Sequence, residues 1–168
     1  AKARTAAEHW QVGHTSIGWT KRLFLSTTAA TDTSIAAWND TAPTSTVFSI
    51  GISGNINNNT TTYVAYCFAP VEGYSAFGSY TGNSSSDGPF VFTGHKSRWL
   101  MIKDTTNSGN WRIYDTARDT YNVAGAKLYP NSAVQENSVT GETASTNTID
   151  FLSNGFKLRT SNSETNYS

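Results

Sequence analysis

Charge is scarce in this sequence, and the charges that are present cancel. Charged residues make up 14% of the 168 positions, and 12 basic residues balance 12 acidic ones. Proteins that bind nucleic acid or anionic lipid carry a basic excess, which is missing here. No apolar run approaches the roughly 20 residues that cross a bilayer as a helix. The composition therefore predicts that neither nucleic acid nor membrane is a partner.

Cysteine is almost absent, because Cys67 is the only one in the chain. A disulfide within the chain and a zinc site built on cysteines are therefore excluded. The neighbours of Cys67 in YVAYCFA are apolar, which indicates a small buried side chain. The only histidines are His9, His14 and His95, and the first two fall on opposite faces of an extended strand. The sequence predicts no metal site and no cofactor.

Long helical patterns are also missing, and small hydroxyl residues and aromatics are abundant instead. The sequence holds 25 threonines, 20 serines and 15 asparagines, with aromatic residues at 12%. Threonine and aromatic side chains favour strands, while serine, asparagine and glycine favour turns. Both faces of 61–69 and of 98–103 are apolar, as expected for central strands. Strands are predicted at 21–27, 45–51, 61–69, 74–80, 89–94, 98–103, 110–115, 126–130 and 149–160. The predicted class is all-β, most simply a sandwich of two packed sheets.

The two halves of the sequence resemble each other at a spacing of about 100 residues. Trp10 matches Trp111 in the first alignment, and Phe24 matches Tyr129 in the second. The aligned segments are EHWQVGH (8–14) with GNWRIYD (109–115), RLFLSTTAA (22–30) with KLYPNSAVQ (127–135), and TVFSIG (46–51) with IDFLSN (149–154). Three matches in one order predict a module that is present twice.

We therefore expect tandem β-sandwich modules that are both incomplete. Residues 1–73 would be the C-terminal part of a first module, and residues 74–168 a second module that lacks its last strand. The missing strands would come from chain outside this sequence or from a neighbouring subunit, because a bare sheet edge attracts a partner strand. The stretch 77–92, FGSYTGNSSSDGPFVF, is predicted to be the first hairpin of a module, with a flexible turn.

Several long motifs resemble a domain that is repeated in bacteriophage virion proteins. They are YVAYCFAPVEGYSAFGSYTGN (63–83), DGPFVFTG (87–94), NWRIYDTARDTYNV (110–123), FLSNGFKLRTSN (151–162) and, from the preceding module, AAWNDTAPTSTVFSIG (36–51). The resemblance implies a jelly-roll or lectin-like β-sandwich in a tail-fibre-like or other structural protein, without catalytic residues to transfer. GHKSRW (94–99) departs from the more apolar stretch that relatives carry there.

The carboxylates are sparse and do not form a recognisable catalytic arrangement. Asp115 and Asp119 bracket Arg118, and Glu142 and Asp150 flank a polar loop. A glycosidase places two carboxyl groups about 5–10 Å apart, and no spacing here indicates such a pair. We interpret Asp115 and Asp119 as turn caps or partners of nearby arginines. Serine-elbow, phosphate-loop and zinc signatures are missing, so no enzymatic activity is predicted.

Aromatic side chains are the candidates for ligand contact, since their flat faces stack on sugar rings. Trp10 and Trp111 occupy matching positions in the two halves and are interpreted as core, as is Trp99 in its hydrophobic strand. Trp19 has no counterpart in the second half, which makes it the best exposed candidate. The candidate ligand-binding residues are Trp19, Tyr74 and Tyr80.

The resemblance implies a non-enzymatic structural protein of the virion, most simply a segment of a tail fibre or related appendage. It would act in assembly and host-surface contact, with other virion subunits and copies of itself as partners. A carbohydrate-binding module that recognises host glycans is the alternative, and a capsid decoration protein is a further one. A depolymerase fragment would need the carboxylates as its catalytic groups.

Overall fold

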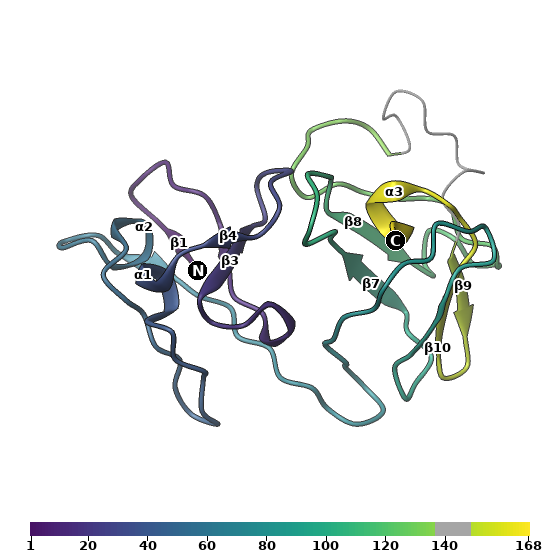
Figure 1. Cartoon of the computed structure of the whole chain (residues 1–168), viewed down its shortest axis with the longest axis horizontal. Helices are drawn as coiled ribbons and strands as arrows, with labels where there is room; N and C mark the ends of the chain where they lie inside the picture. Colours follow the sequence, from purple (N-terminus) through teal and green to yellow (C-terminus); the bar gives the residue numbers. More distant parts are fainter. Residues whose placement is uncertain (137–148) are drawn as a thin grey trace. The chain divides into compact units, whose positions relative to one another are not determined.

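The protein is mostly β, with several small antiparallel sheets and a few short helices, which confirms the predicted β-rich class. A computed structural model describes residues 1–136 and 149–168. The chain forms two compact units (Figure 1). Unit 1 comprises residues 1–68 and 105–109, and unit 2 comprises residues 69–104 and 110–168.

The strands are short, and the helices consist of single turns. The strands are β1 (Lys2–Ala3), β2 (Gln11–Val12), β3 (Lys21–Phe24), β4 (Asp32–Thr33), β5 (Tyr63–Val64), β6 (Phe90–Phe92), β7 (Trp99–Ile102), β8 (Arg112–Asp115), β9 (Ile149–Leu152) and β10 (Gly155–Leu158). The helices are the 3-10 turn η1 (Thr15–Ile17), α1 (Ile35–Trp38), α2 (Gly54–Asn57) and α3 (Ser163–Asn166). Helix α1 ends at Asn39, which adopts the left-handed conformation that asparagine tolerates (φ 54°).

Unit 1 contains a pair of strands, β1 and β5, and a three-stranded sheet in the order β2-β3-β4. Ala1 and Gln11 join the two sheets, because the amino group of Ala1 donates to the Gln11 carbonyl (2.7 Å) and the Gln11 amide donates to the Ala1 carbonyl (2.8 Å). A small core lies beside the sheets, where α1 and α2 bury apolar side chains. Its buried residues are Ala37, Trp38 and Ile56, with Ala1, Trp19 and Tyr63 packed against them.

The loop between β7 and β8 contributes residues 105–109 to unit 1. The Thr31 amide donates to the Thr105 carbonyl (3.0 Å), and the Gly109 amide donates to the Thr28 carbonyl (2.8 Å). Covalent connections therefore run between the units at three points of the chain, rather than through a single linker.

Unit 2 contains the hairpin β7-β8 and the three-stranded sheet β6-β10-β9. Two isolated bridges continue the pairing, because Ile113 of β8 pairs with Leu128 and Ala124 pairs with Ile149 of β9. Alternate residues of both groups of strands face a common core, as period-two burial requires. The core residues are Leu100, Ile102, Tyr114, Ala124, Ile149, Phe151, Phe156 and Leu158.

Gly155, at the start of β10, allows β6 to pack closely against β10. A Cβ atom at this position would lie 2.1 Å from the Val91 carbonyl oxygen and 2.9 Å from the Phe90 ring. The absence of a side chain therefore lets β6 approach β10 and lets the Phe90 ring lie over the glycine. The SNG sequence thus supplies both the turn and the site at which β6 docks.

Several expected strands are shorter than the sequence suggested or do not form. Residues 45–51 and 74–80 form no strand, and the expected strand 61–69 is confined to β5. Residues 98–103 were expected to be a central strand, but β7 pairs only with β8 among the described residues. Hydrophobic alternation indicates a segment that is able to join a sheet. A strand forms only where a neighbouring segment completes its backbone hydrogen bonds.

Candidate functional site

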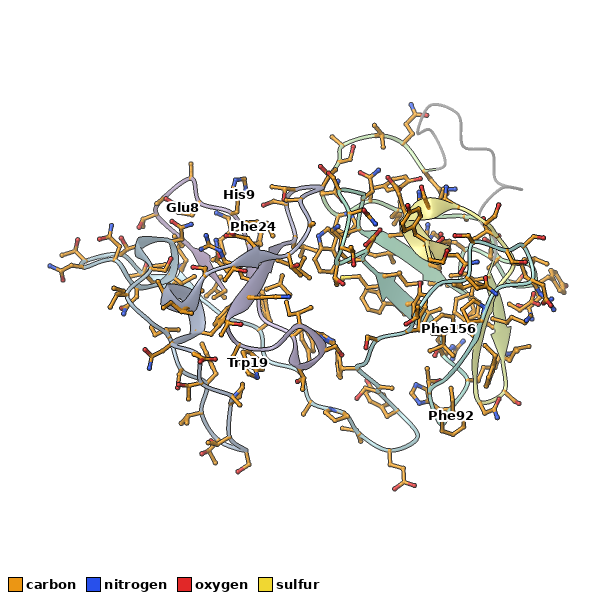
Figure 2. All side chains as sticks on the ribbon, in the orientation of Figure 1. Glu8, His9, Trp19, Phe24, Phe92 and Phe156 are labelled. Carbon is orange, nitrogen blue, oxygen red and sulfur yellow. The ribbon has the colours of Figure 1, made fainter. Side chains whose placement is uncertain are left out.

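Trp19, the leading sequence candidate for ligand binding, packs within unit 1. Its ring meets Trp38 edge to face, with ring centroids 6.3 Å apart, and its side chain is half-buried. A Cβ atom on Gly13 would lie 2.7 Å from the Trp19 ring, so the backbone just after β2 passes close to the indole. Trp19 thus lies against the core of unit 1 (Figure 2), and only part of its surface remains for a ligand.

Tyr74 and Tyr80, the other two candidates, lie in different surroundings. Tyr74 is 81% exposed, in the turn closed by backbone pairing of Val71 with Ser75. Tyr80 is half-buried; its ring packs edge to face on Phe156, and its hydroxyl donates to the Thr165 carbonyl (2.6 Å). Burial raises the pKa of Tyr80 well above that of a free tyrosine. Tyr74 is therefore the more accessible of the two for a ligand.

Two of the three histidines, His9 and His14, make local contacts. His9 hydrogen-bonds through Nδ1 to the Ser26 hydroxyl (2.9 Å), and His14 Nδ1 accepts from the Ser16 amide (3.1 Å) at the start of η1. Burial lowers the pKa of His14. No group of three histidine, cysteine, aspartate or glutamate side chains able to hold a metal occurs among residues 1–136 and 149–168.

The carboxylates Asp115 and Asp119 support turns and an ion pair. Asp115 accepts from the Arg118 amide (2.9 Å) and pairs with the Arg118 guanidinium (2.6 Å). Asp119 accepts from two backbone amides, of Gly125 (2.8 Å) and of Ala126 (2.5 Å). These contacts match the interpretation of both residues as turn caps or arginine partners.

The remaining two carboxylates of that set fall in different places. Asp150, on β9, pairs with Arg159 at 2.6 Å. Glu142 lies outside the described residues. Arg159 also lies 3.8 Å from Asp87, which in turn pairs with Lys157 at 2.8 Å. These four charges therefore form a row of ion pairs that runs from the buried Asp150 to the exposed Asp87.

Asn166 holds the polar loop 81–88 in place, a role that the sequence did not indicate. Its side chain is fully buried; the two hydrogens of Nδ2 are directed to the Ser85 carbonyl (2.7 Å) and the Thr160 carbonyl (2.7 Å), and the Asn83 side-chain oxygen lies 3.0 Å from the same nitrogen. Its Oδ1 accepts from the Asn83 amide (2.8 Å). The turn that we expected to be flexible is therefore fastened to the C-terminal segment.

Arg112, on β8, also binds the C-terminal segment. The Arg112 side chain is fully buried, donates to Asn162 Oδ1 (2.6 Å) and forms an ion pair with Glu164. Asn162 in turn caps α3 by accepting from the Glu164 amide (2.9 Å). The sequence NSE carries a helix-capping signal, but nothing in it reveals that the partner is an arginine on β8.

Two extended segments of the described chain carry exposed apolar side chains at positions where the sequence predicted burial. On β7, Trp99 is 53% exposed and Met101 is 37% exposed, so the expectation that Trp99 belongs to the core is wrong. Trp111 is buried, as expected, at 7% exposure. Along β7, Trp99 and Met101 alternate with the buried Leu100 and Ile102, and β8 is the one strand that pairs with β7 in the part of the chain that the structure describes.

The second segment follows β5, at residues 65–68. Tyr66 is 66% exposed and Phe68 is 78% exposed, and Tyr66 stacks on Trp10 with ring centroids 5.9 Å apart. Cys67 is exposed as a free thiol, so the expectation of a buried side chain is wrong. Exposed apolar edges of this kind mark surfaces where another strand can pair. The candidate functional surface is therefore the set of exposed apolar side chains on β7 and on residues 65–68.

Comparison with known proteins identifies the family. Among the described residues, no helix has the length and apolar character required to cross a membrane. No curated protein and no solved structure matches the sequence significantly. One family model, described as a domain of unknown function (DUF7483), matches residues 1–168. The chain therefore belongs to the family of this domain, DUF7483.

Proposed function

We propose that this chain is a non-enzymatic structural segment of a bacteriophage virion, built from tandem β-sandwich modules of a tail fibre or related surface appendage. The long motifs at 63–83, 87–94, 110–123 and 151–162, which resemble repeated virion domains, support the assignment. The observation that carries it is that the two units pair their strands at matching positions. A tandem repeat of this kind builds length rather than a reactive centre.

The matching pairs follow the sequence alignment of the two halves. In unit 1, Gln11 exchanges hydrogen bonds with Ala1, and Val12 pairs with Leu23. The aligned residues in unit 2 are Arg112, which pairs with Ile102, and Ile113, which pairs with Leu128. Strands β2 and β8 thus have equivalent neighbours on both sides, which supports a module that is present twice.

The likeness weakens further along the chain. Phe151 is buried in β9, whereas its aligned residue Phe48 is 40% exposed in a segment without strand pairing. In our proposal, residues 1–73 are the later part of a first module and residues 74–168 are a second module without its last strand. A segment such as 46–51 would then gain its order from a neighbouring strand that the described residues do not supply.

The partners in this proposal are other virion subunits and further copies of the chain, located on the virion surface. A host-surface glycan is the second candidate partner, favoured by Tyr74, which presents an 81% exposed ring on a tight turn. Flat exposed aromatic rings suit contact with the apolar face of a sugar. Neither nucleic acid nor membrane is part of the proposal.

Electron microscopy of intact particles tests the proposal. Antibodies against the purified chain should label the tail or an appendage of the phage that encodes it, and peptides of the chain should occur among the particle proteins. Label on the head would favour the capsid decoration alternative. Absence of the chain from purified particles would refute a virion role.

Glycan binding has a separate test. An array of bacterial surface polysaccharides probed with the chain should show binding that is lost in Tyr74→Ala and retained in Tyr121→Ala. Tyr121 is a matched control because it is also highly exposed, at 86%. Equal loss in both variants would exclude a specific role for Tyr74.

A further inference from the structure

The outer face of the sheet β6-β10-β9 carries two exposed phenylalanines. Phe90 is 46% exposed and Phe92 is 69% exposed, whereas Val91 between them packs against the core of unit 2. Phe92 lies at the surface, and Phe156, on the other face of the sheet, is buried (Figure 2). Side chains at alternate positions of a strand point to the same side, with about 7 Å between their Cα atoms. The sheet therefore presents two neighbouring rings to solvent.

Gly155 makes room for the Phe90 ring on this face. It pairs with Phe92 across the sheet, and a Cβ atom on Gly155 would lie 2.9 Å from the Phe90 ring. The Phe90 ring therefore lies over the glycine, in space that any other side chain would fill, and the rest of its surface is turned to solvent. Packing on Gly155 accounts for Phe90, but it does not account for Phe92, whose side chain is mostly exposed.

Charged groups of both signs lie beside these rings. Lys157 is opposite Phe90 in the register of β10 and β6, and its ammonium pairs with Asp87 (2.8 Å). Arg159, two residues further along the chain, pairs with Asp150 (2.6 Å) and lies 3.8 Å from Asp87. The four charges sum to zero, so this surface favours neither an anionic nor a cationic ligand.

Asp87 is held in position by the loop that contains it. Its carbonyl accepts from Asn83 Nδ2 (3.0 Å) and its amide donates to Ser85 Oγ (3.1 Å), and Asn166 contacts both of these residues. The Asp87 side chain is 80% exposed, which leaves carboxylate lone pairs open to a ligand beside the ion pair. The Arg159 side chain is 42% exposed and carries N–H donors. Groups that are ordered in advance lose little entropy when a ligand binds.

We propose that this face, formed by Phe90, Phe92, Asp87 and Arg159, binds neutral pyranose oligosaccharides. The inference deepens the glycan alternative of the proposed function, on which it rests for the host surface as the source of the sugar. Phe90 and Phe92 stack on the C–H faces of adjacent sugar units. Asp87 accepts from one sugar hydroxyl and Arg159 donates to another, while Lys157 positions the carboxylate.

Other classes of ligand fit this surface less well. An anionic polymer is attracted by an excess of basic charge, whereas each cation here is paired with a carboxylate. The buried centre of a protein interface is depleted of charged residues, whereas here the charges border the rings directly. A sugar needs flat apolar surface next to groups that both donate and accept, because each hydroxyl does both.

Titration with defined oligosaccharides tests the site. The probes are neutral hexasaccharides of glucose, galactose, mannose and N-acetylglucosamine in α- and β-linked forms, with hexagalacturonate as the acidic comparison. The Tyr74→Ala chain is used throughout, so that the turn at Tyr74 contributes nothing. The backbone amide NMR signals of Asp87 and of residues 90–93 should shift with a neutral probe, and hexagalacturonate should bind more weakly.

Substitutions at Phe92 separate stacking from other contacts. Phe92→Ala should weaken binding about tenfold because one stacked ring is lost, and Phe92→Trp should retain binding because it restores a flat ring. Tyr121→Ala is the matched control, since it removes an 86% exposed ring elsewhere in unit 2 and should leave the affinity unchanged. Thermal unfolding should be similar in all of these variants, because both side chains are mostly exposed.

Three results would overturn the inference. Absence of shifts at Asp87 and at 90–93 with every neutral probe would exclude the site, and unchanged affinity in Phe92→Ala would show that sugar binds elsewhere. Stronger binding of hexagalacturonate would mean that charge rather than stacking selects the ligand. None of these results alters the labelling of virions or the comparison of Tyr74→Ala with Tyr121→Ala on the array, so failure here is distinct from failure of the proposed function.

Discussion

Replacement of Asn166 tests whether one buried side chain holds the C-terminal segment to loop 81–88. Asn166 is fully buried, and its amide group bonds two backbone carbonyls, one backbone amide and the Asn83 side chain. Asn166→Ala removes all four contacts and leaves the backbone groups without their partner. Asn166→Asp keeps the shape but turns the donating nitrogen into a second acceptor.

The four contacts set the size of the effect. A hydrogen bond contributes a net of about 1 kcal/mol to folding, so Asn166→Ala should cost about 3–4 kcal/mol. Asn166→Asp should cost more at neutral pH, because a buried carboxylate would face the carbonyl oxygens of Ser85 and Thr160. Protonation restores one donor, so lowering the pH should recover part of the loss of Asn166→Asp and none of that of Asn166→Ala.

Hydrogen exchange at single amides measures the effect locally. The Asn83 amide, which donates to Asn166 Oδ1, should exchange faster in both variants, and urea unfolding should show the lowered stability of unit 2. Asn59→Ala is the control, since Asn59 is an exposed asparagine of unit 1, outside this network. If Asn166→Ala changes stability by less than about 0.5 kcal/mol, as ordinary surface changes do, the loop is held by other contacts.

Three further substitutions probe other parts of the fold. Gly51→Ala should destabilise unit 1, as judged by thermal unfolding, because its Cβ would lie 2.3 Å from the Ala36 carbonyl oxygen; an unchanged melting temperature would contradict this close approach. Tyr80→Phe should cost about 1 kcal/mol in urea unfolding through loss of one hydrogen bond. Burial opposes the charge of Asp115, but hydrogen bonds and charge from Arg118 outweigh it and lower the pKa of Asp115. Because the pKa of Asp115 is lower in the folded protein, its ionised carboxylate stabilises the fold above pH 3.8, and this stabilisation is lost as the pH falls below that value. Asp115→Asn should therefore make the free energy of unfolding depend less steeply on pH in the acid range.

The β-rich class could be predicted because its signals are local. Alternation in 149–160 and the SNG turn mark the hairpin of β9 and β10, and the apolar core residues Ile149, Phe151, Phe156 and Leu158 fall at alternate positions of the two strands. Residues 45–51 carry the same kind of pattern, yet Val47, Phe48 and Ile50 remain exposed. The difference lies in the partner strand, which is a non-local property that no window of sequence contains.

The candidate site was harder to predict for the same reason. Trp99 and Cys67 were assigned to the interior because their neighbours are apolar, and both are exposed. Apolar character indicates that a residue favours burial, but it does not say whether the covering strand belongs to the same chain. Asn166 illustrates the converse, since a polar residue in a polar tail is fully buried by contacts with a loop more than 80 residues away.

The edges of the two units differ in how well they are protected against association. Edge strand β4 is two residues long and carries Asp32 in an ion pair with Arg22 (2.7 Å), and edge strand β6 follows directly on Pro89. Charge, shortness and proline are the usual means by which an edge avoids unwanted pairing. The Trp99–Ile102 edge has no charge and no proline within its length. Met101→Lys adds a charge at an outward position that is 37% exposed, so it should change the free energy of unfolding in urea by less than about 0.5 kcal/mol; a larger loss would show that the Met101 side chain is covered.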